Sequence, residues 1–306
     1  MNRRLDETEL RELRGLVDED HICLDEPMSR HTTFRIGGPA EVFLTPDLQE
    51  LESVLSFCKA HDIPVTIVGN GSNLLVSDAG ISGVVIKIGK HMAQIEVSGH
   101  EITAGAGAML SAVAKTAERN SLAGMEFASG IPGSLGGGCI MNAGAYGGEL
   151  KDILTEITVI SKDGTLETVD AKDADLSYRH SRFMESGEIV VSAKMVLEDG
   201  VEEEIKAKSA DFNQRRRDKQ PLNFPSAGST FKRPEGYFAG KLIQDSGLRG
   251  YRVGGAQVSE KHCGFVVNVD NATAADVRQL ISDVQEKVKS ETGVEIHPEV
   301  RFLGDF

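Results

Sequence analysis

The sequence predicts a protein of mixed helices and strands with two or three domains. A chain of 306 residues is long enough for more than one buried core. Segments with helical and strand-type hydrophobic patterns alternate along it, and hairpin turns join several of the strands. A Gly-x-Gly at residues 69–71 follows a strand, yet further strand-type segments succeed it. Because a Rossmann motif must open a helix, and no Gly-Lys-Ser/Thr is present for a phosphate loop, both of those folds are disfavoured.

The composition predicts a soluble, cytoplasmic protein. Hydrophobic residues make up 40% of the chain and charged residues 26%, as in ordinary globular proteins. No apolar run approaches the roughly 18 residues of a membrane span. The opening 15 residues have an amphipathic helical pattern and lack the apolar core of a signal peptide. The net charge of −14 repels nucleic acid and anionic membranes, so we expect neither as a partner.

The cysteines and histidines favour neither a disulfide framework nor a metal site. No C-x-x-C pair occurs, so we expect reduced and mostly buried thiols. The eight histidines show no H-E-x-x-H or similar ligand spacing. The scattered cysteines are Cys23, Cys58, Cys139 and Cys263.

The first half of the chain is expected to form short strands and three helices. After the N-terminal helix, the stretch 31–46 suggests strands. A second helix begins at Thr45-Pro46-Asp47, with Pro46 in its first helical position. Its apolar face consists of Leu48, Leu51, Leu55 and Cys58. The remaining expected elements are strands at 63–69, 74–77 and 84–88, a hairpin at 94–104 and a helix at 110–120.

The second half is expected to contain a hairpin, a long strand and two long helices. An Asp-Gly turn at residues 163–164 joins two strands, and residues 189–197 form a long strand. Residues 199–219 begin as strand and end as a helix whose basic cluster is either a solvated face or an anion site. The last helix begins at Thr273 with a capping box to Asp276. Its apolar face consists of Val277, Leu280, Ile281, Val284 and Val288.

Glycine is concentrated between Gly130 and Gly148, where it occupies eight of nineteen positions. Bare backbone N–H groups, with Ser134 and Asn142 as side-chain donors, can form a concave site for an anion such as a phosphate. A flexible linker is the alternative, but linkers lack the apolar residues interleaved here. The turn at 69–74, with Ser72 and Asn73, is likewise better explained as a phosphate-binding turn than as a purely structural one.

A second chemical motif lies in PSAGSTFKRPEG, residues 225–236. Ser229 and Lys232 match the S-x-x-K nucleophile motif of penicillin-binding acyl enzymes. Those enzymes also need S-D-N and K-T-G, and neither tripeptide occurs in the chain. The acyl-enzyme interpretation is therefore disfavoured.

Five motifs in one order make a more specific pattern than any of them alone. They are GNGSNLL at 69–75, GIPGSLGGGCIMNAGAYG at 130–147, YRHSRF at 178–183, PSAGSTFKRP at 225–234 and PEVRF at 298–302. Together they resemble the UDP-N-acetylenolpyruvoylglucosamine reductases, over nearly the whole chain. The resemblance implies an α+β fold throughout, with a two-subdomain FAD-binding fold of the vanillyl-alcohol-oxidase (PCMH) type at residues 1–90 and 91–200. A substrate-binding domain follows at 201–306, and its last segment, 294–306, returns to the active site.

The resemblance also implies the reaction. NADPH reduces a non-covalently bound FAD and leaves, and UDP-N-acetylglucosamine enolpyruvate then accepts a hydride at C3 and a proton at C2. The product, UDP-N-acetylmuramate, is a peptidoglycan precursor. By the same resemblance, Arg179 is the cation beside the substrate carboxylate, Glu299 lies near that carboxylate, and Ser229 donates the proton. Taken singly, each of the three could instead have a structural role.

The remaining site residues implied by the resemblance bind cofactor or substrate. The expected FAD contacts are Gly69, Asn70, Gly71, Ser72, Asn73, Leu74, Gly130, Ile131, Pro132, Gly133, Ser134, Gly136, Gly137, Asn142 and Ala143. The expected substrate contacts are Tyr178, Arg216, Lys219, Lys232, Arg233, Gln244 and His262.

The chain departs from the longer type of the family in two places. With fifty positions from Arg179 to Ser229, it matches the shorter type without an inserted tyrosine lid. Arg233 stands where the longer type has asparagine. Two other functions remain as alternatives: that of another FAD oxidase of the same fold, and that of a non-catalytic flavin- or UDP-sugar-binding protein. We expect a monomer or a weak dimer.

Overall fold

The structure, a computed structural model, describes residues 4–306 and divides the chain into two compact units. The first unit comprises residues 1–24, 42–70 and 83–215, and the second comprises 25–41, 71–82 and 216–306. Each unit has its own core of buried aliphatic and aromatic side chains. Within the described residues, no helix is long and apolar enough to cross a membrane.

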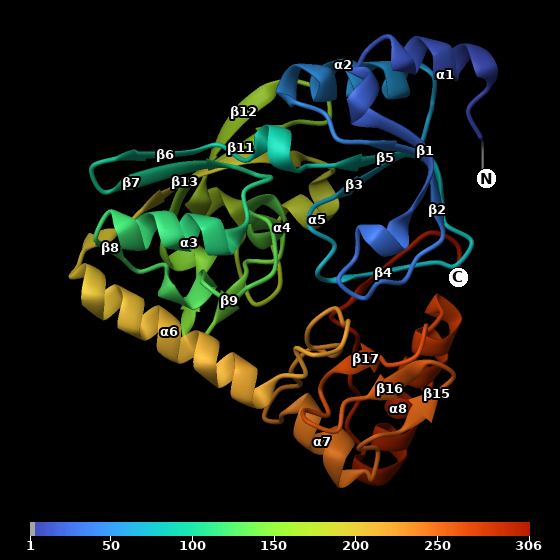
Figure 1. Cartoon of the computed structure of the whole chain (residues 1–306), viewed down its shortest axis with the longest axis vertical. Helices are drawn as coiled ribbons and strands as arrows, with labels where there is room; N and C mark the ends of the chain where they lie inside the picture. The colour runs from blue at the N-terminus through green and yellow to red at the C-terminus, as the bar shows by residue number, and fades with distance from the viewer. Residues whose placement is uncertain (1–3) are drawn as a thin grey trace. The chain divides into compact units, whose positions relative to one another are not determined.

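The first unit is built on a five-stranded antiparallel sheet in the order β12-β11-β13-β7-β6. The helices α3 and α4 lie on one face of this sheet (Figure 1). Buried Ile102 and Ala104 alternate with exposed residues along β7, the period-two pattern of a sheet with one covered face. The strands are β6 (Ile95–Ser98), β7 (Glu101–Gly105), β11 (Leu154–Ile160), β12 (Leu166–Asp170) and β13 (Ile189–Val196).

A second sheet contains residues of both units. The strands β1, β2, β5 and β3 form this four-stranded sheet in that order, with β3 and β5 parallel, and residues 25–27, 39–41 and 81–82 of its strands belong to the second unit. Its strands are β1 (Ile22–Pro27), β2 (Pro39–Leu44), β3 (Val65–Val68) and β5 (Ile81–Lys87). The helices are α1 (Glu7–Arg14), α2 (Leu48–Ala60), α3 (Leu110–Arg119), α4 (Leu135–Ile140), α5 (Phe183–Ser186) and α6 (Glu202–Lys219). Short two-residue strands are β8 (Leu122–Ala123), β9 (Gly144–Ala145), β10 (Gly148–Glu149) and β14 (Glu198–Asp199).

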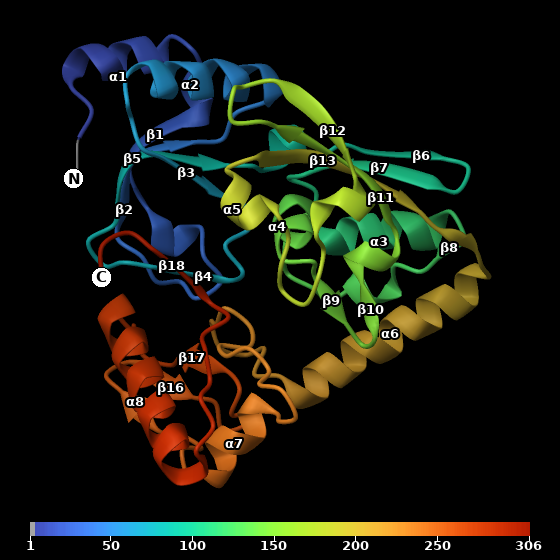
Figure 2. The same ribbon diagram turned by 180° about the vertical axis from the view of Figure 1, so that it is seen from behind.

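The second unit packs the long helix α8 against a three-stranded sheet, β15-β16-β17, and the shorter α7 against α8 (Figure 2). A parallel pair, β4 and β18, joins the C-terminal segment to the strand after the glycine turn. The helices are α7 (Ala239–Asp245) and α8 (Ala274–Thr292). The strands are β4 (Leu74–Val76), β15 (Arg252–Val253), β16 (Ala256–Val258), β17 (Val266–Asn268) and β18 (Arg301–Leu303).

Several elements form as the sequence predicts. Thr273 caps α8 with the expected box to Asp276, and the five apolar residues of the predicted face are all buried. The predicted strands, the two hairpins and the helix at 110–120 also form, with shifts of a few residues at their ends. Strand segments follow residues 69–71, which confirms that this Gly-x-Gly does not open a helix.

Three local predictions are wrong. Pro46 is not the first helical residue of α2, because Asp47 is the N-cap and forms a capping box with Glu50. Leu48 is 37% exposed and therefore does not belong to the buried face of that helix. The stretch 31–38, expected to be strand, has no regular secondary structure, and its backbone passes through a positive φ at Arg35.

Candidate active site

The two glycine-rich segments meet in the first unit. The Asn70 side chain donates a hydrogen bond of 2.7 Å from Nδ2 to the Pro132 carbonyl. A Cβ atom on Gly69 would collide with Oγ of Ser134. Position 69 therefore has no room for a side chain, because the Gly130–Gly148 segment lies directly against its backbone.

The surroundings of Ser134 fit a bound polar group. Ser134 is the N-cap of α4 and is 3% exposed, but its side chain makes no capping hydrogen bond. Within residues 4–306, its buried Oγ has no hydrogen-bond partner. A Cβ on Gly136 would lie 2.8 Å from Cβ of Ala106, so the first turn of α4 sits directly on the sheet. A buried hydroxyl without a partner, beside bare glycine backbone, is suited to a phosphate or another hydrogen-bonding part of a flavin nucleotide.

Asn142 has a different role from the predicted side-chain donor. It is fully buried, and its Nδ2 donates to Oε2 of Glu149 and to the carbonyl of Ser177 at 2.6 and 3.1 Å. Its Oδ1 accepts a hydrogen bond of 2.9 Å from the amide of Lys151. The side chain is thus occupied inside the protein and holds the end of the glycine segment to residues 149–177. Only its backbone is left for a ligand.

Arg179 is held in a strained loop beside the same segment. Its φ is +54°, a left-handed conformation that residues other than glycine adopt rarely and that is enriched at functional sites. Its Nη2 lies 3.5 Å from the carbonyl of Gly144, and its guanidinium lies 5.1 Å from the centre of the Tyr178 ring. The neighbouring Asp175 pairs with Nε2 of His180 at 3.0 Å.

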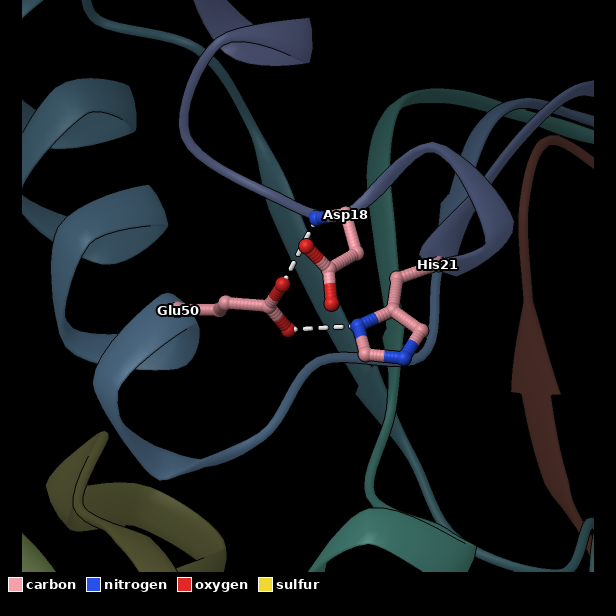
Figure 3. Close-up of side chains that lie close together, drawn as sticks. All are labelled: Asp18, His21 and Glu50. Atoms are coloured by element: carbon pink, nitrogen blue, oxygen red, sulfur yellow. Dashed lines mark hydrogen bonds and ion pairs between the residues drawn. The ribbon is translucent and has the colours of Figure 1, made fainter.

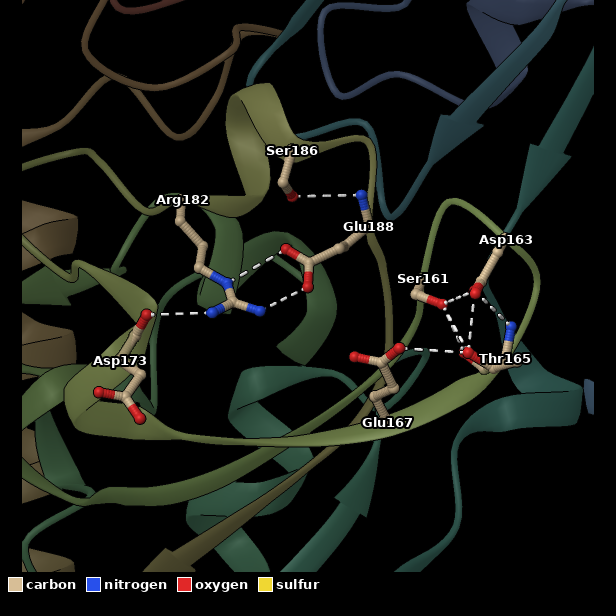
Figure 4. Close-up of polar contacts among 8 residues, drawn as sticks. All are labelled: Ser161, Asp163, Thr165, Glu167, Asp173, Arg182, Ser186 and Glu188. Atoms are coloured by element: carbon tan, nitrogen blue, oxygen red, sulfur yellow. Dashed lines mark hydrogen bonds and ion pairs between the residues drawn. The ribbon is translucent and has the colours of Figure 1, made fainter.

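A network of polar contacts anchors both ends of that loop (Figure 4). Arg182 donates to both carboxylate oxygens of Glu188, at 2.5 and 3.1 Å, and to the carbonyl of Asp173 at 3.3 Å. Burial would raise the pKa of Glu188, but hydrogen bonds from Arg182 and Ser186 and the Arg182 charge outweigh it and lower the pKa. Glu188 is therefore ionised, and a bidentate pair of this kind fixes geometry as well as charge.

In the second unit, hydrogen bonds bring Ser229 and Glu299 onto neighbouring segments. The amide of Glu299 donates to the carbonyl of Thr230 at 2.8 Å, and the amide of Lys232 donates to the carbonyl of His297 at 2.8 Å. Between these two hydrogen bonds, Phe231 and Pro298 pair as an isolated antiparallel β-bridge. Ser229 itself is exposed, and Glu299 is half-buried. The sequence separates the predicted proton donor and the predicted acid by seventy residues, and the fold makes them neighbours.

The rest of the glycine turn reaches the same place. Nδ2 of Asn73 donates to the carbonyl of Glu299 at 3.1 Å, and the Arg301 amide donates to the carbonyl of Asn73 at 2.9 Å. The predicted turn 69–74 is therefore divided, with 69–70 in the first unit and 71–74 in the second. A further segment joins this group without any signal in the sequence: the Thr33 amide donates to the Gly71 carbonyl at 3.2 Å, and Thr33 Oγ1 donates to the Ser226 carbonyl at 2.6 Å.

Five further residues predicted to contact the substrate lie at the end of α6 and in the segments after Ser229. Arg216 and Lys219 lie in the last turn of α6. The Arg233 guanidinium lies 4.1 Å from the centre of the exposed Phe238 ring. Gln244 accepts a hydrogen bond from Arg249, and Nδ1 of His262 accepts one from the amide of Gly264 at 3.1 Å. Burial lowers the pKa of His262.

Comparison with known proteins identifies the family of this chain. An FAD binding domain model matches residues 39–170, and the model of the UDP-N-acetylenolpyruvoylglucosamine reductase C-terminal domain matches residues 220–303. The chain is 56% identical to the UDP-N-acetylenolpyruvoylglucosamine reductase of Agathobacter rectalis over 93% of its length and 95% of that protein. It belongs to the UDP-N-acetylenolpyruvoylglucosamine reductase family. The corresponding reductase of Lachnoclostridium phytofermentans is 52% identical over 97% of both chains.

Solved structures agree with this family and with the predicted fold. The reductase of Thermus caldophilus superimposes with a TM-score of 0.80 at 34% identity, covering 92% of this chain and 98% of that one. A glucose dehydrogenase, Phl p 4.0202, shares the fold at 13% identity, with a TM-score of 0.51 over 94% of this chain and 64% of its own. The predicted combination of an FAD-binding fold and a C-terminal α+β domain is confirmed, and the chain is an FAD-containing oxidoreductase.

Proposed function

We propose that the chain catalyses the NADPH-dependent, FAD-mediated reduction of UDP-N-acetylglucosamine enolpyruvate to UDP-N-acetylmuramate. The observation that carries the proposal is the 56% identity, over 93% of this chain, to a reductase named for that substrate. When bound, FAD supplies a two-electron carrier between NADPH and the carbon–carbon double bond of the substrate. The product places the reaction in peptidoglycan precursor synthesis, and through it in cell-wall growth, cell shape and division.

In this proposal, the glycine segments hold the cofactor. Ser134 offers its unpartnered hydroxyl, and the bare backbone of Gly69 and Gly136 permits close approach. The other FAD contacts are the backbone and side chains of residues 69–74 and 130–143 named by resemblance. The buried side chain of Asn142 supports the loop from within, because its hydrogen bonds end on the protein.

Arg179 is proposed to stabilise the charge that develops on the substrate carboxylate as hydride adds to C3. A cation fixed before the reaction lowers the barrier more than one that must reorganise. The strained backbone at Arg179 and the Arg182–Glu188 pair that anchors the loop support such a fixed position. Tyr178, whose ring lies beside the Arg179 guanidinium, is proposed to contact the substrate.

Ser229 is proposed to deliver the proton to C2, and Glu299 to orient or replenish that proton. A serine hydroxyl is a poor acid alone, so it needs polar neighbours. The hydrogen bond between the Glu299 amide and the Thr230 carbonyl supports this arrangement, because it brings the two segments together. Lys232 follows on the same segment and is proposed to polarise the site. One hydride and one proton are added, and NADPH becomes NADP⁺.

The nucleotide part of the substrate is proposed to contact Arg216, Lys219, Arg233, Gln244 and His262. We further propose the three-part division of the chain at residues 1–90, 91–200 and 201–306, and a cytoplasmic monomer or weak dimer. The chain is proposed to be of the shorter type, in which no inserted tyrosine lid covers the substrate.

The assay for the proposal follows NADPH oxidation and oxygen uptake, with and without the enolpyruvyl sugar nucleotide. We expect one NADPH consumed per UDP-N-acetylmuramate formed, and no steady consumption without substrate. Substrate-independent NADPH consumption with oxygen uptake would instead indicate an oxidase. Ligand binding without turnover would indicate a non-catalytic binding protein.

The proton-donor assignment is tested with Ser229→Ala. Flavin reduction by NADPH should keep its wild-type rate, while turnover with substrate should fall by about 10²- to 10⁴-fold, the usual contribution of general acid catalysis. Ser290→Ala is the matched control, since Ser290 is exposed on α8 and its hydroxyl bonds only the local Lys287 carbonyl. If both half-reactions of a folded Ser229→Ala protein fail equally, the assignment is wrong.

A further inference from the structure

An aromatic pair joins α6 to the hairpin β9–β10 in the first unit. The rings of Tyr146 and Phe212 are stacked, with their centres 4.6 Å apart and their planes 8° from parallel. Tyr146 lies in the glycine-rich segment and is 40% exposed. Phe212 lies on α6, is half-buried and packs against the core of the first unit. The pair therefore fastens an exposed turn to a helix that is itself packed on the core.

The backbone at Tyr146 does not favour a tyrosine. Tyr146 and Gly147 form the two-residue turn of the hairpin, and their φ angles are +55° and +89°. A hairpin turn with a positive φ at both central residues favours Asn, Asp or Gly at the first of them. A larger side chain is disfavoured in this left-handed conformation. The stack on Phe212 is a contact that offsets this cost and explains an aromatic ring at the turn.

The hairpin is too short to fix its own position. Its two strands pair only Gly144 with Glu149 and Ala145 with Gly148. An isolated two-stranded hairpin is at best marginally stable in water, so contacts outside it must hold it in place. The Asn142 side chain bonds Glu149 at the open end, at 2.6 Å. At the closed end, the contact is the stack of the turn on α6.

The loop that carries Arg179 rests on this hairpin. Nη2 of Arg179 lies 3.5 Å from the carbonyl of Gly144 in the first strand. Ser177 and His180 exchange both backbone hydrogen bonds at 3.1 Å and so close the loop around Arg179. The Asn142 side chain, which holds the open end of the hairpin, also donates to the Ser177 carbonyl at 3.1 Å. The guanidinium and the base of its loop are thus both tied to the hairpin.

We propose that Phe212 is a positioning residue for Arg179 and acts through Tyr146 and the hairpin. The inference rests on the role proposed above for Arg179, because a cation that stabilises developing charge must be fixed before the reaction. Loss of the Phe212 ring would free the hairpin turn, shift the Gly144 carbonyl and let the guanidinium move. A displacement of about 1 Å in a positioned group can lower a rate about 100-fold. Phe212 itself supplies no atom to the reaction.

The experiment compares Phe212→Leu with Phe212→Tyr in the full-length, FAD-loaded enzyme. Leucine keeps an apolar side chain but removes the ring, whereas tyrosine keeps the ring. We expect kcat with the enolpyruvyl sugar nucleotide to fall about 10- to 100-fold in Phe212→Leu and to return near the wild-type value in Phe212→Tyr. Flavin reduction by NADPH should keep its wild-type rate in both variants, because no charge develops on the substrate carboxylate in that step.

Phe57→Leu controls for the general cost of removing a half-buried ring. Phe57 lies on α2 in the same unit, packs against the same core and has its ring centre 4.4 Å from that of His61. It is outside the contacts that hold the hairpin. Phe57→Leu should therefore lower the melting temperature about as much as Phe212→Leu and leave kcat unchanged.

Amide hydrogen exchange supplies a measurement that does not depend on activity. Without substrate, residues 144–149 and 177–180 should exchange faster in Phe212→Leu than in the wild type, Phe212→Tyr or Phe57→Leu, because both segments depend on the stack. Coupling to Arg179 is measured in an Arg179→Gln protein, where adding Phe212→Leu should lower kcat no further.

The outcomes separate this inference from the proposed function. Absence of reductase activity in the wild-type enzyme would refute the proposed function. Unchanged exchange at residues 177–180 in Phe212→Leu would refute the inference itself, whatever the activity. It would also be refuted by wild-type kcat in Phe212→Leu, by an equal loss of kcat in Phe57→Leu, or by a full further loss of kcat in the Arg179→Gln protein.

Discussion

Asn142→Ala is expected to destabilise the first unit far more than an ordinary surface substitution. It would leave the Lys151 amide without its partner, whereas the Ser177 carbonyl keeps the His180 amide and the Glu149 carboxylate keeps the Lys151 ammonium. The unpaired amide costs about 1–3 kcal/mol, and each of the other two lost hydrogen bonds costs about 0.5 kcal/mol, the low end for a group that keeps a second partner. The φ of +41° adds about 1 kcal/mol for alanine. The total is roughly 3 to 5 kcal/mol.

Thermal and urea unfolding of the protein test this magnitude. In a unit of this size, 1 kcal/mol corresponds to about 2–4 °C, so Asn142→Ala should lower the melting temperature by roughly 6 to 20 °C. Saturating FAD should restore part of the loss, because the ligand binds only the folded state.

Asp62→Ala is the matched control for Asn142→Ala. Asp62 lies in the same unit at a φ of +54°, is exposed, and makes no side-chain hydrogen bond of the kind found at Asn142. It isolates the backbone cost, and we expect a decrease of only about 2–4 °C. If the two variants lose the same stability, the hydrogen bonds of Asn142 contribute nothing and its proposed internal role is refuted.

Two further predictions concern ionisation. Arg182→Ala should cost about 1–3 kcal/mol at pH 7, because it leaves the mostly buried Glu188 carboxylate without its partner. The pKa of Glu188 is lowered from 4.5 in the folded state, so its stabilisation is present above that value and is lost as pH falls. Urea titrations of wild type and Arg182→Ala should therefore converge in acid, and a constant difference down to pH 3 would contradict this reasoning. Burial raises the pKa of Cys58 and Cys139 to about 12. A thiol reagent at pH 8 should therefore modify the exposed Cys23 in the native protein and leave Cys58 and Cys139 unmodified. Rapid labelling of Cys58 or Cys139 would show that the core opens.

Local signals predicted most of the secondary structure. The capping box at Thr273 and the 3.6-residue apolar period determine α8 without help from the rest of the chain. The Asp-Gly turn at 163–164 likewise joins β11 and β12 as expected. The predicted start of α2 was wrong because Asp47, and not the residue before Pro46, is the N-cap of the helix. The predicted strand at residues 31–38 was wrong because this stretch forms turns and irregular backbone.

The sequence by itself determined the family, the cofactor class and the order of the motifs, because these depend on residue types that are visible one segment at a time. Only the tertiary structure decided which segments meet. It placed Glu299 beside Ser229 across seventy residues, divided the turn 69–74 between two units, and turned Asn142 inward. It also brought Glu50 to His21, which is 29 positions away in the sequence (Figure 3). Neighbourhood between distant residues depends on sheet register and core packing, which are properties of the whole fold.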